Sequence, residues 1–250
     1  MLLALPLLWL LWYPRRERPT PESLVRRRWL LMAGVFFAAD LALWHQSIRY
    51  TSVANATLLA NLSPVFVTGA AVWLFGERIN ARFFGGLVLA MAGSAVLVAD
   101  SFGVGLQTVM GDLLGVAAAV FYSVYLLGVS RMRRYASAVE VMWWTTLACT
   151  LALLPLTLML DEPLWPQSLR GWSVLVGLAL VSQIAGQGLI AWAMAHLSPS
   201  FSSVSLLVQP VAAAALAWIL LSEPFGAWQA LGGAIVIGGI VSCRLAMVKT

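Results

Sequence analysis

The chain has 250 residues, 61% of them apolar and only 10% charged, with 15 basic and 10 acidic side chains. Because a soluble globular domain is about one-quarter charged, this composition excludes a soluble globular protein, and it equally excludes a disordered or fibrous chain. The net charge of +5 does not by itself indicate a nucleic-acid partner, since its meaning depends on where the charges lie. The two cysteines, Cys149 and Cys243, lie inside apolar runs and match neither a disulfide framework nor a zinc site.

Apolar segments long enough to cross a bilayer recur along the whole chain. Residues 1–13 are too short to cross a hydrocarbon core of about 30 Å, and basic residues follow them instead of preceding them, unlike a signal peptide. We interpret them as the last part of a spanning helix. Eight complete spans are predicted next, at residues 29–49, 52–75, 81–99, 110–130, 138–160, 171–195, 200–221 and 226–246. The sequence therefore predicts an all-α integral membrane protein with no separate soluble domain.

Basic residues divide unequally between the two sides of the predicted membrane. If the loop at residues 14–28 is cytoplasmic and the sides alternate from there, thirteen basic residues fall on the cytoplasmic side and two, Arg49 and Arg170, on the other. Lys and Arg accumulate in cytoplasmic loops because their translocation is disfavoured. We therefore predict that this loop, the Arg131–Arg134 loop and the C-terminus all lie in the cytoplasm.

The two halves of the chain form a weak internal repeat. A shift of 146 positions superposes them without a gap, and the matched residues include Pro64 and Pro210, Glu77 and Glu223, Gly86 and Gly232, and Gly93 and Gly239. Equivalent helices are separated by five spans, an odd number, so the halves should have opposite orientations in the membrane. Inverted repeats of this kind are typical of secondary transporters.

Two stretches carry a family resemblance. Residues 49–98 read RYTSVANATLLANLSPVFVTGAAVWLFGERINARFFGGLVLAMAGSAVLV, with a small-residue helix start, a mid-helix proline, Gly-Glu at the turn and a glycine-rich following helix. Residues 196–242 look like a second copy, with Ser-Glu-Pro in place of Gly-Glu. Both resemble the EamA-type repeat of the drug/metabolite transporter superfamily.

The resemblance implies two inverted five-helix repeats. Residues 1–99 would form the first repeat, residues 100–109 a short non-cytoplasmic linker and residues 110–250 the second repeat. The family's usual form has ten helices, which implies that this chain lacks the first helix and the start of the second. By the same resemblance, the function is export of small metabolites, amino acids or amphiphilic compounds across a bacterial inner membrane.

Asp40 is the acidic residue that our boundaries place near the bilayer midplane. A charge at that depth costs at least about 2.5–3.5 kcal/mol, so its side chain should face a cavity or a partner. Trp44 and Ser47 lie within about 40° of it on a helical wheel, and Gly186 takes its place in the second repeat. We interpret Asp40 as a proton-coupling or cation-binding carboxylate. The alternative is a neutral aspartic acid that hydrogen-bonds between helices.

Polar stripes accompany the two repeated prolines. The first stripe consists of Thr57, Asn61, Pro64 and Thr68, and the second of Ser202, Ser205, Gln209 and Pro210. A proline has no N–H, so Pro64 and Pro210 should each release a carbonyl, those of Ala60 and Leu206. Paired interruptions in corresponding helices predict a substrate site near the midplane. The alternative is that these side chains hydrogen-bond between helices.

Further polar side chains fall inside the spans. Two pairs share a helix face, namely Gln183 with Gln187 and Tyr122 with Tyr125. Amide and phenol groups suit an amphiphilic or zwitterionic substrate. Glu77 and Glu223 close the two proline-containing helices at opposite membrane faces, where turn capping is the preferred interpretation and a role in gating the alternative.

The sequence favours a secondary transporter, without cofactor or metal, over two other classes. A polytopic membrane enzyme is disfavoured because both histidines are isolated, no H-E-x-x-H or G-x-S-x-G motif occurs and no loop is long enough to build a catalytic site. An inactive fragment or scaffold is the third hypothesis, on account of the missing first helix. Proton coupling is a hypothesis, and substrate, transport direction and oligomeric state are left open.

Overall fold

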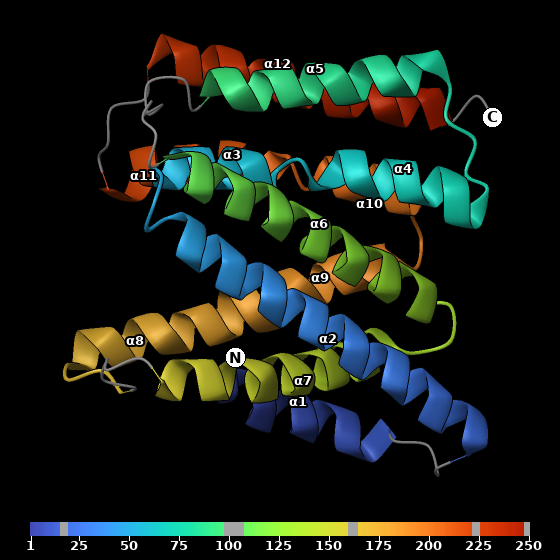
Figure 1. The fold of residues 1–250 in the computed structure, drawn as a ribbon, viewed down its shortest axis with the longest axis vertical. Coiled ribbons are helices and arrows are strands. Elements are labelled where there is room, and N and C mark those ends of the chain that lie inside the picture. The colour runs from blue at the N-terminus through green and yellow to red at the C-terminus, as the bar shows by residue number, and fades with distance from the viewer. Residues whose placement is uncertain (16–19, 98–107, 160–164, 222–225, 248–250) are drawn as a thin grey trace. The chain divides into compact units, whose positions relative to one another are not determined.

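The computed structural model describes residues 1–15, 20–97, 108–159, 165–221 and 226–247, and every described element is a helix (Figure 1). Helical segments long and apolar enough to cross a membrane are Pro21–Ser47, Val53–Phe75, Val109–Met132, Ala138–Leu158, Leu169–Ala193, Pro199–Leu220 and Ala227–Met247. Shorter apolar helices occupy Leu2–Arg15 and Ala81–Leu97. The prediction of an all-α integral membrane protein is confirmed.

The predicted spans at 81–99 and 29–49 correspond to helices α5 and α2. Helix α5 (Ala81–Leu97) has 17 residues, and residues 98–99 of the expected span lie outside the described part of the chain. The span expected to begin at 29 is helix α2 (Pro21–Ser47), which begins eight residues earlier. The loop expected at 14–28 is therefore helical in its second half.

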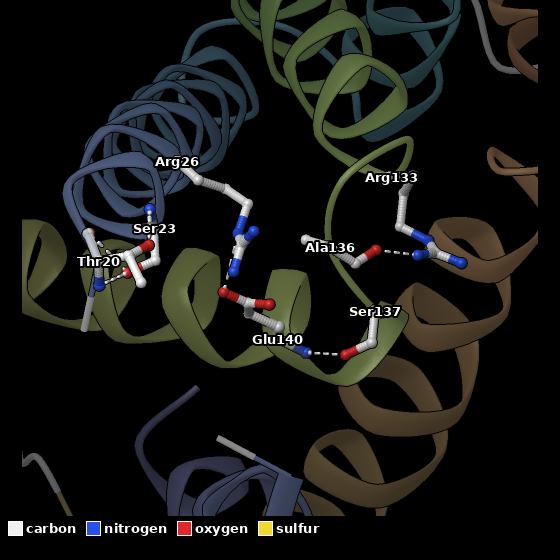
Figure 2. Close-up of polar contacts among 7 residues, drawn as sticks. All are labelled: Thr20, Ser23, Arg26, Arg133, Ala136, Ser137 and Glu140. Atoms are coloured by element: carbon white, nitrogen blue, oxygen red, sulfur yellow. Dashed lines mark hydrogen bonds and ion pairs between the residues drawn. The ribbon is translucent and has the colours of Figure 1, made fainter. Parts of the chain in front are cut away.

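Local capping explains the early start of α2 (Figure 2). The backbone N–H of Ser23 donates to Oγ1 of Thr20 and the N–H of Thr20 donates to Oγ of Ser23, at 3.1 and 2.9 Å. Pro21 at the first helical position and Glu22 in the first turn both favour a helix start. The hydropathy pattern did not predict residues 21–28 as part of the span because Arg26, Arg27 and Arg28 are polar. The capping residues Thr20 and Ser23 can nevertheless be recognised in the sequence.

Contacts divide the chain into two compact units. Unit 1 comprises Met1–Ala42 and Val124–Ser198, and unit 2 comprises Leu43–Ser123 and Pro199–Thr250. Each unit takes one segment from each half of the sequence repeat, so the compact units do not coincide with the repeats. The division falls inside α2 and inside α6 (Thr108–Met132), and each unit is described by itself.

Unit 1 contains the N-terminal helices and the middle of the chain. From the N-terminal part it takes the short helices Leu2–Ala4, α1 (Leu5–Trp12) and Tyr13–Arg15 and the first part of α2. From the middle of the chain it takes the end of α6, α7 (Ala138–Leu158), α8 (Leu169–Gly177), the π-helix Leu178–Gly186 and α9 (Gln187–Ala193). Helix α1 packs on α7, and Leu30, Leu126 and Met142 are among the fully buried side chains.

Arg133 holds the polar end of unit 1 together (Figure 2). It lies in the turn between α6 and α7, where its Nε donates to the carbonyl of Ala191 at 2.8 Å and its Nη1 donates to the carbonyl of Ala136. Ser137 caps α7 by accepting from the N–H of Glu140 at 3.1 Å. Burial lowers the pKa of Arg133, and the two carbonyls compensate for the lost hydration.

Unit 2 contains two broken helices and a tightly packed helix pair. Its elements are the end of α2, α3 (Val53–Ala60), α4 (Ser63–Phe75), α5, the first part of α6, α10 (Pro199–Ser205), α11 (Val208–Leu221) and α12 (Ala227–Met247). Helices α5 and α12 lie side by side along their length (Figure 1).

The α5–α12 pair is antiparallel and reciprocal. A Cβ atom on Gly86 would lie 2.8 Å from the carbonyl oxygen of Gly239, and a Cβ atom on Gly93 would lie 2.8 Å from that of Gly232. The shift of 146 positions relates Gly86 to Gly232 and Gly93 to Gly239, so each pair is the image of the other. Reciprocal contacts are what a two-fold axis produces, and they support the inverted repeat.

Candidate functional site

Unit 1 places an aromatic and an amide side chain together in its interior. Tyr125 on α6 is almost fully buried, and its hydroxyl donates to Oε1 of Gln187 on α9 at 3.4 Å. The Tyr125 ring stacks on Phe37 of α2, with ring centroids 4.5 Å apart and planes 16° apart. Three helices therefore meet at Tyr125. The structure joins Tyr125 to Gln187, whereas the sequence pattern paired each of them only with a residue on its own helix.

Gln183 lies on the π-helix Leu178–Gly186, one turn before Gln187. It is buried, and its Nε2 donates to Oγ1 of Thr146 on α7 at 2.8 Å. The sequence predicts one regular helix over 171–195, so the π-helix is a finding of the structure. Such segments occur frequently at functional sites because they widen the helix and free backbone groups from the regular pattern.

Asp40 lies on α2, one turn after Phe37, and is 9% exposed. Within the part of the chain that the structure describes, its carboxyl group has no hydrogen bond and no ion pair. Cys149 on α7, one turn after Thr146, is close enough to interact electrostatically with it. Unit 1 thus buries a carboxyl on α2, a phenol on α6 and an amide on the π-helix, and it half-buries the second amide, that of Gln187 on α9.

Two predicted neighbours of Asp40 on α2 differ in their surroundings. Ser47 is completely buried, and its hydroxyl donates to the carbonyl of Gly111 on α6 at 2.7 Å. This bond commits the Ser47 hydroxyl to helix packing within unit 2. Trp44 is half-buried and meets the ring of His45 edge to face, at 5.1 Å between centroids.

The repeated prolines accompany short helix interruptions. Helix α3 ends at Ala60 and α4 begins at Ser63, just before Pro64, and α10 ends at Ser205 while α11 begins at Val208, just before Pro210. The expected interruptions are therefore present at corresponding positions. One detail is wrong: the carbonyl of Leu206 is not released, because it accepts from the backbone N–H of Gln209 at 2.9 Å.

The polar stripes beside these breaks are only partly buried. Pro64 and Thr68 are buried, Thr57, Asn61, Tyr122 and Pro210 are half-buried, and Gln209 is exposed in unit 2. No hydrogen bond among the described residues joins Asn61 to Gln209. The structure therefore shows the two breaks, and it packs α10, which carries Ser202 and Ser205, against α4, which carries Pro64 and Thr68.

Glu77 makes a long-range contact in addition to closing its helix. Gly76 ends α4 with a positive φ of 65°, and the N–H of Glu77 donates to the carbonyl of Ala71 at 3.2 Å. The Oε2 atom of Glu77 also accepts from the hydroxyl of Ser200 on α10 at 2.8 Å, while its Oε1 is buried with no partner among the described residues. The sequence could not reveal this bond across 123 positions. Glu223 lies outside the described residues.

The described residues hold no group of three or more His, Cys, Asp or Glu side chains that could bind a metal ion. A bundle of membrane-spanning helices with paired broken helices and buried polar side chains is the architecture of a membrane transporter. The model of the EamA-like transporter family matches residues 1–99 and 109–244. The chain belongs to this family and is a membrane transporter.

Named relatives are exporters rather than enzymes. The chain is 27% identical to the pseudopaline exporter CntI of Pseudomonas aeruginosa over 83% of its own length and 72% of the exporter. It is 31% identical to the aromatic amino acid exporter YddG of Ancylobacter novellus over 81% of its own length and 70% of that protein. A solved crystal structure, 22% identical, superposes with a TM-score of 0.80 over 97% of this chain and 85% of the other, and shares the fold.

Proposed function

We propose that the protein is a proton-coupled secondary exporter of small zwitterionic or amphiphilic molecules such as amino acids. The observation that carries this proposal is the buried polar group of unit 1, in which Asp40 has no cationic partner among the described residues. A buried acid inside a membrane bundle is costly unless it binds a proton or a cation during function. The printed names of the relatives, which include an aromatic amino acid exporter, agree with such a substrate.

Each polar side chain of this group has a role in the proposal. Asp40 exchanges a proton for the ammonium group of the substrate. Gln187 accepts from Tyr125 through Oε1, so its amide N–H groups are available for a substrate carboxylate. The bond from Gln183 to Thr146 orients the π-helix that precedes Gln187.

The broken helices provide the moving parts in the proposal. Pro64 and Pro210 interrupt corresponding helices of two inverted repeats, at residues 1–99 and 110–250, and the half-buried Thr57, Asn61 and Tyr122 with Gln209 line the pathway. Alternating access is a rearrangement at the two broken helices, in which the reciprocal α5–α12 contact stays fixed as the symmetric core of unit 2. Glu77 and Glu223 act as gates at the two ends, with Ser200 as the closing partner of Glu77.

Transport by the purified protein tests this proposal. In proteoliposomes loaded with a mixture of labelled amino acids and given a pH gradient, we expect gradient-driven movement of at least one amino acid above that of protein-free vesicles. Gln187→Leu removes the amide and should reduce this rate by about tenfold, the effect of losing one or two hydrogen bonds to a charged group. Gln167→Leu, at an exposed position, is the matched control. Absence of movement for every zwitterionic solute would contradict the proposal.

We also propose that the protein lies in a bacterial inner membrane with its C-terminus in the cytoplasm. The thirteen-to-two distribution of basic residues and the bacterial relatives support this orientation. A cysteine introduced at the exposed Arg134 should resist a membrane-impermeant thiol reagent in intact cells, whereas one at the exposed Gln167 should react. The native Cys149 and Cys243 are buried, so the unmodified protein serves as the unlabelled control. Labelling of residue 134 alone would reverse the orientation.

A further inference from the structure

Four large side chains gather where α1, α2 and α7 of unit 1 meet. The rings of Trp12 and Trp143 stack with centroids 5.5 Å apart and planes 11° apart, and Trp12 meets Trp144 edge to face at 5.6 Å. The guanidinium of Arg27 lies over the Trp144 ring, 5.2 Å from its centroid. We call these residues the Trp–Arg cluster. Helices α2 and α7 make a second contact nearby, which Figure 2 shows. There Arg26 of α2 forms an ion pair with Glu140 of α7.

The Trp–Arg cluster contains buried donors without acceptors. Nε of Arg27 and Nε1 of both Trp143 and Trp144 are buried and have no hydrogen-bond partner within the described part of the chain. Guanidinium and indole N–H groups can only donate, so these side chains cannot satisfy one another. Buried polar groups in native proteins are nearly always paired, which indicates that an acceptor is supplied from outside the protein.

The missing acceptor should be negatively charged. Glu140 is the acidic side chain beside the cluster, and Arg26 already binds it at 3.2 Å. Arg28 and Arg134 at the same end of unit 1 are exposed and add positive charge, while Glu22 is the other described acid in the first turns of α2. An anionic group would therefore satisfy the donors and offset the local excess of arginine.

The surroundings of the cluster favour a lipid over a soluble anion. Tryptophan and arginine near helix ends are typical of the headgroup level of a membrane. Exposed apolar side chains flank the cluster on the same helices, among them Leu10 on α1 and Leu24, Val25 and Trp29 on α2. All four cluster side chains are half-buried, although the three donor atoms themselves are buried, so a rotation of Arg27 would bring its N–H groups to a headgroup at the surface of the cluster.

We propose that the Trp–Arg cluster binds the phosphate group of an anionic phospholipid, whose acyl chains lie along the exposed apolar side chains of α1 and α2. Arg27 supplies the charge and two or more N–H donors, and Trp144 holds the guanidinium in place through the cation–π contact. This site is separate from the buried polar group around Asp40 and does not depend on the transported substrate.

Lipid retention by the intact protein tests the proposal. The purified protein is exchanged into bilayer nanodiscs of phosphatidylcholine with or without phosphatidylglycerol, and both its thermal midpoint and the lipids it keeps in native mass spectrometry are measured. We expect phosphatidylglycerol to raise the midpoint and to be retained, and Arg27→Gln to weaken retention by about tenfold, as loss of a charge-assisted hydrogen bond predicts. Arg134→Gln is the control and should retain the lipid.

Two further arms make the result decisive. Trp144→Phe keeps an aromatic ring under Arg27 but removes one donor, so it should fold and lose part of the retention. Glycerol phosphate, which has the same headgroup chemistry without acyl chains, should not raise the midpoint. Equal midpoints in the two lipid mixtures, equal loss in Arg27→Gln and Arg134→Gln, or full stabilisation by glycerol phosphate would each overturn a phospholipid site.

Discussion

Gly239→Val is expected to prevent correct packing of α5 against α12. A Cβ atom at this position would lie 2.5 Å from the backbone nitrogen of Ala90 and 2.6 Å from the carbonyl oxygen of Gly86. These are backbone atoms, so no side-chain rotation can relieve the clash, and the two helices would have to separate. Overpacking of this kind costs about 3 kcal/mol or more. Because the pair runs along most of both helices, unit 2 should lose its folded structure or most of its thermal stability.

Gly238→Val provides the matched control, since a Cβ atom on Gly238 would meet nothing within 4 Å. Both variants add the same apolar volume to adjacent positions of the same helix, so they differ only in the direction that the side chain takes. Size-exclusion chromatography in detergent and the thermal midpoint of the purified protein measure the difference. Similar midpoints for the two variants would show that the close approach of α5 and α12 is not needed for folding.

Asp40→Asn is expected to separate transport from the pH gradient. The substitution keeps the shape of the side chain and its capacity for hydrogen bonds, but an amide cannot bind and release a proton. If Asp40 carries the coupling proton, gradient-driven transport should fall at least about tenfold, the effect of losing a residue that acts in a required step. Exchange of substrate across the membrane without a gradient should fall less, because Gln187 still binds the substrate carboxylate although the ammonium group loses its charged partner.

Glu22→Gln is the control for Asp40→Asn, because Glu22 lies on the same helix in an exposed position. Both variants are reconstituted at equal density in proteoliposomes, and initial rates are compared with and without an imposed pH gradient. Retention of full gradient-driven transport by Asp40→Asn would mean that the buried carboxyl is structural. Loss of exchange in the same proportion as gradient-driven transport would mean that Asp40 binds substrate without coupling it to protons.

Hydropathy and local sequence patterns determined the membrane-spanning architecture. Apolar runs with few charges predicted most helix ends to within a few residues. The reason is that transfer of such a run from water into lipid dominates its free energy of insertion. The repeat of Pro64 and Pro210 predicted both helix breaks, because a missing N–H acts within one turn wherever the helix lies. The predicted start of α2 was too late, also for a local reason. The polar Arg26, Arg27 and Arg28 lower the hydropathy of the first turns, although Thr20 caps the helix there.

Only the tertiary structure decided which polar groups meet. The bonds from Gln183 to Thr146, Tyr125 to Gln187 and Ser200 to Glu77 join residues 37, 62 and 123 positions apart. Single-sequence patterns report the face of a helix that a residue occupies but not the helix that packs against that face. For the same reason the sequence could not predict that the donors of the Trp–Arg cluster lie together without acceptors. Its tryptophans are explained equally well as anchors at the membrane interface. Helix packing also produced the π-helix, whose altered pitch depends on neighbouring side chains and not on local propensity.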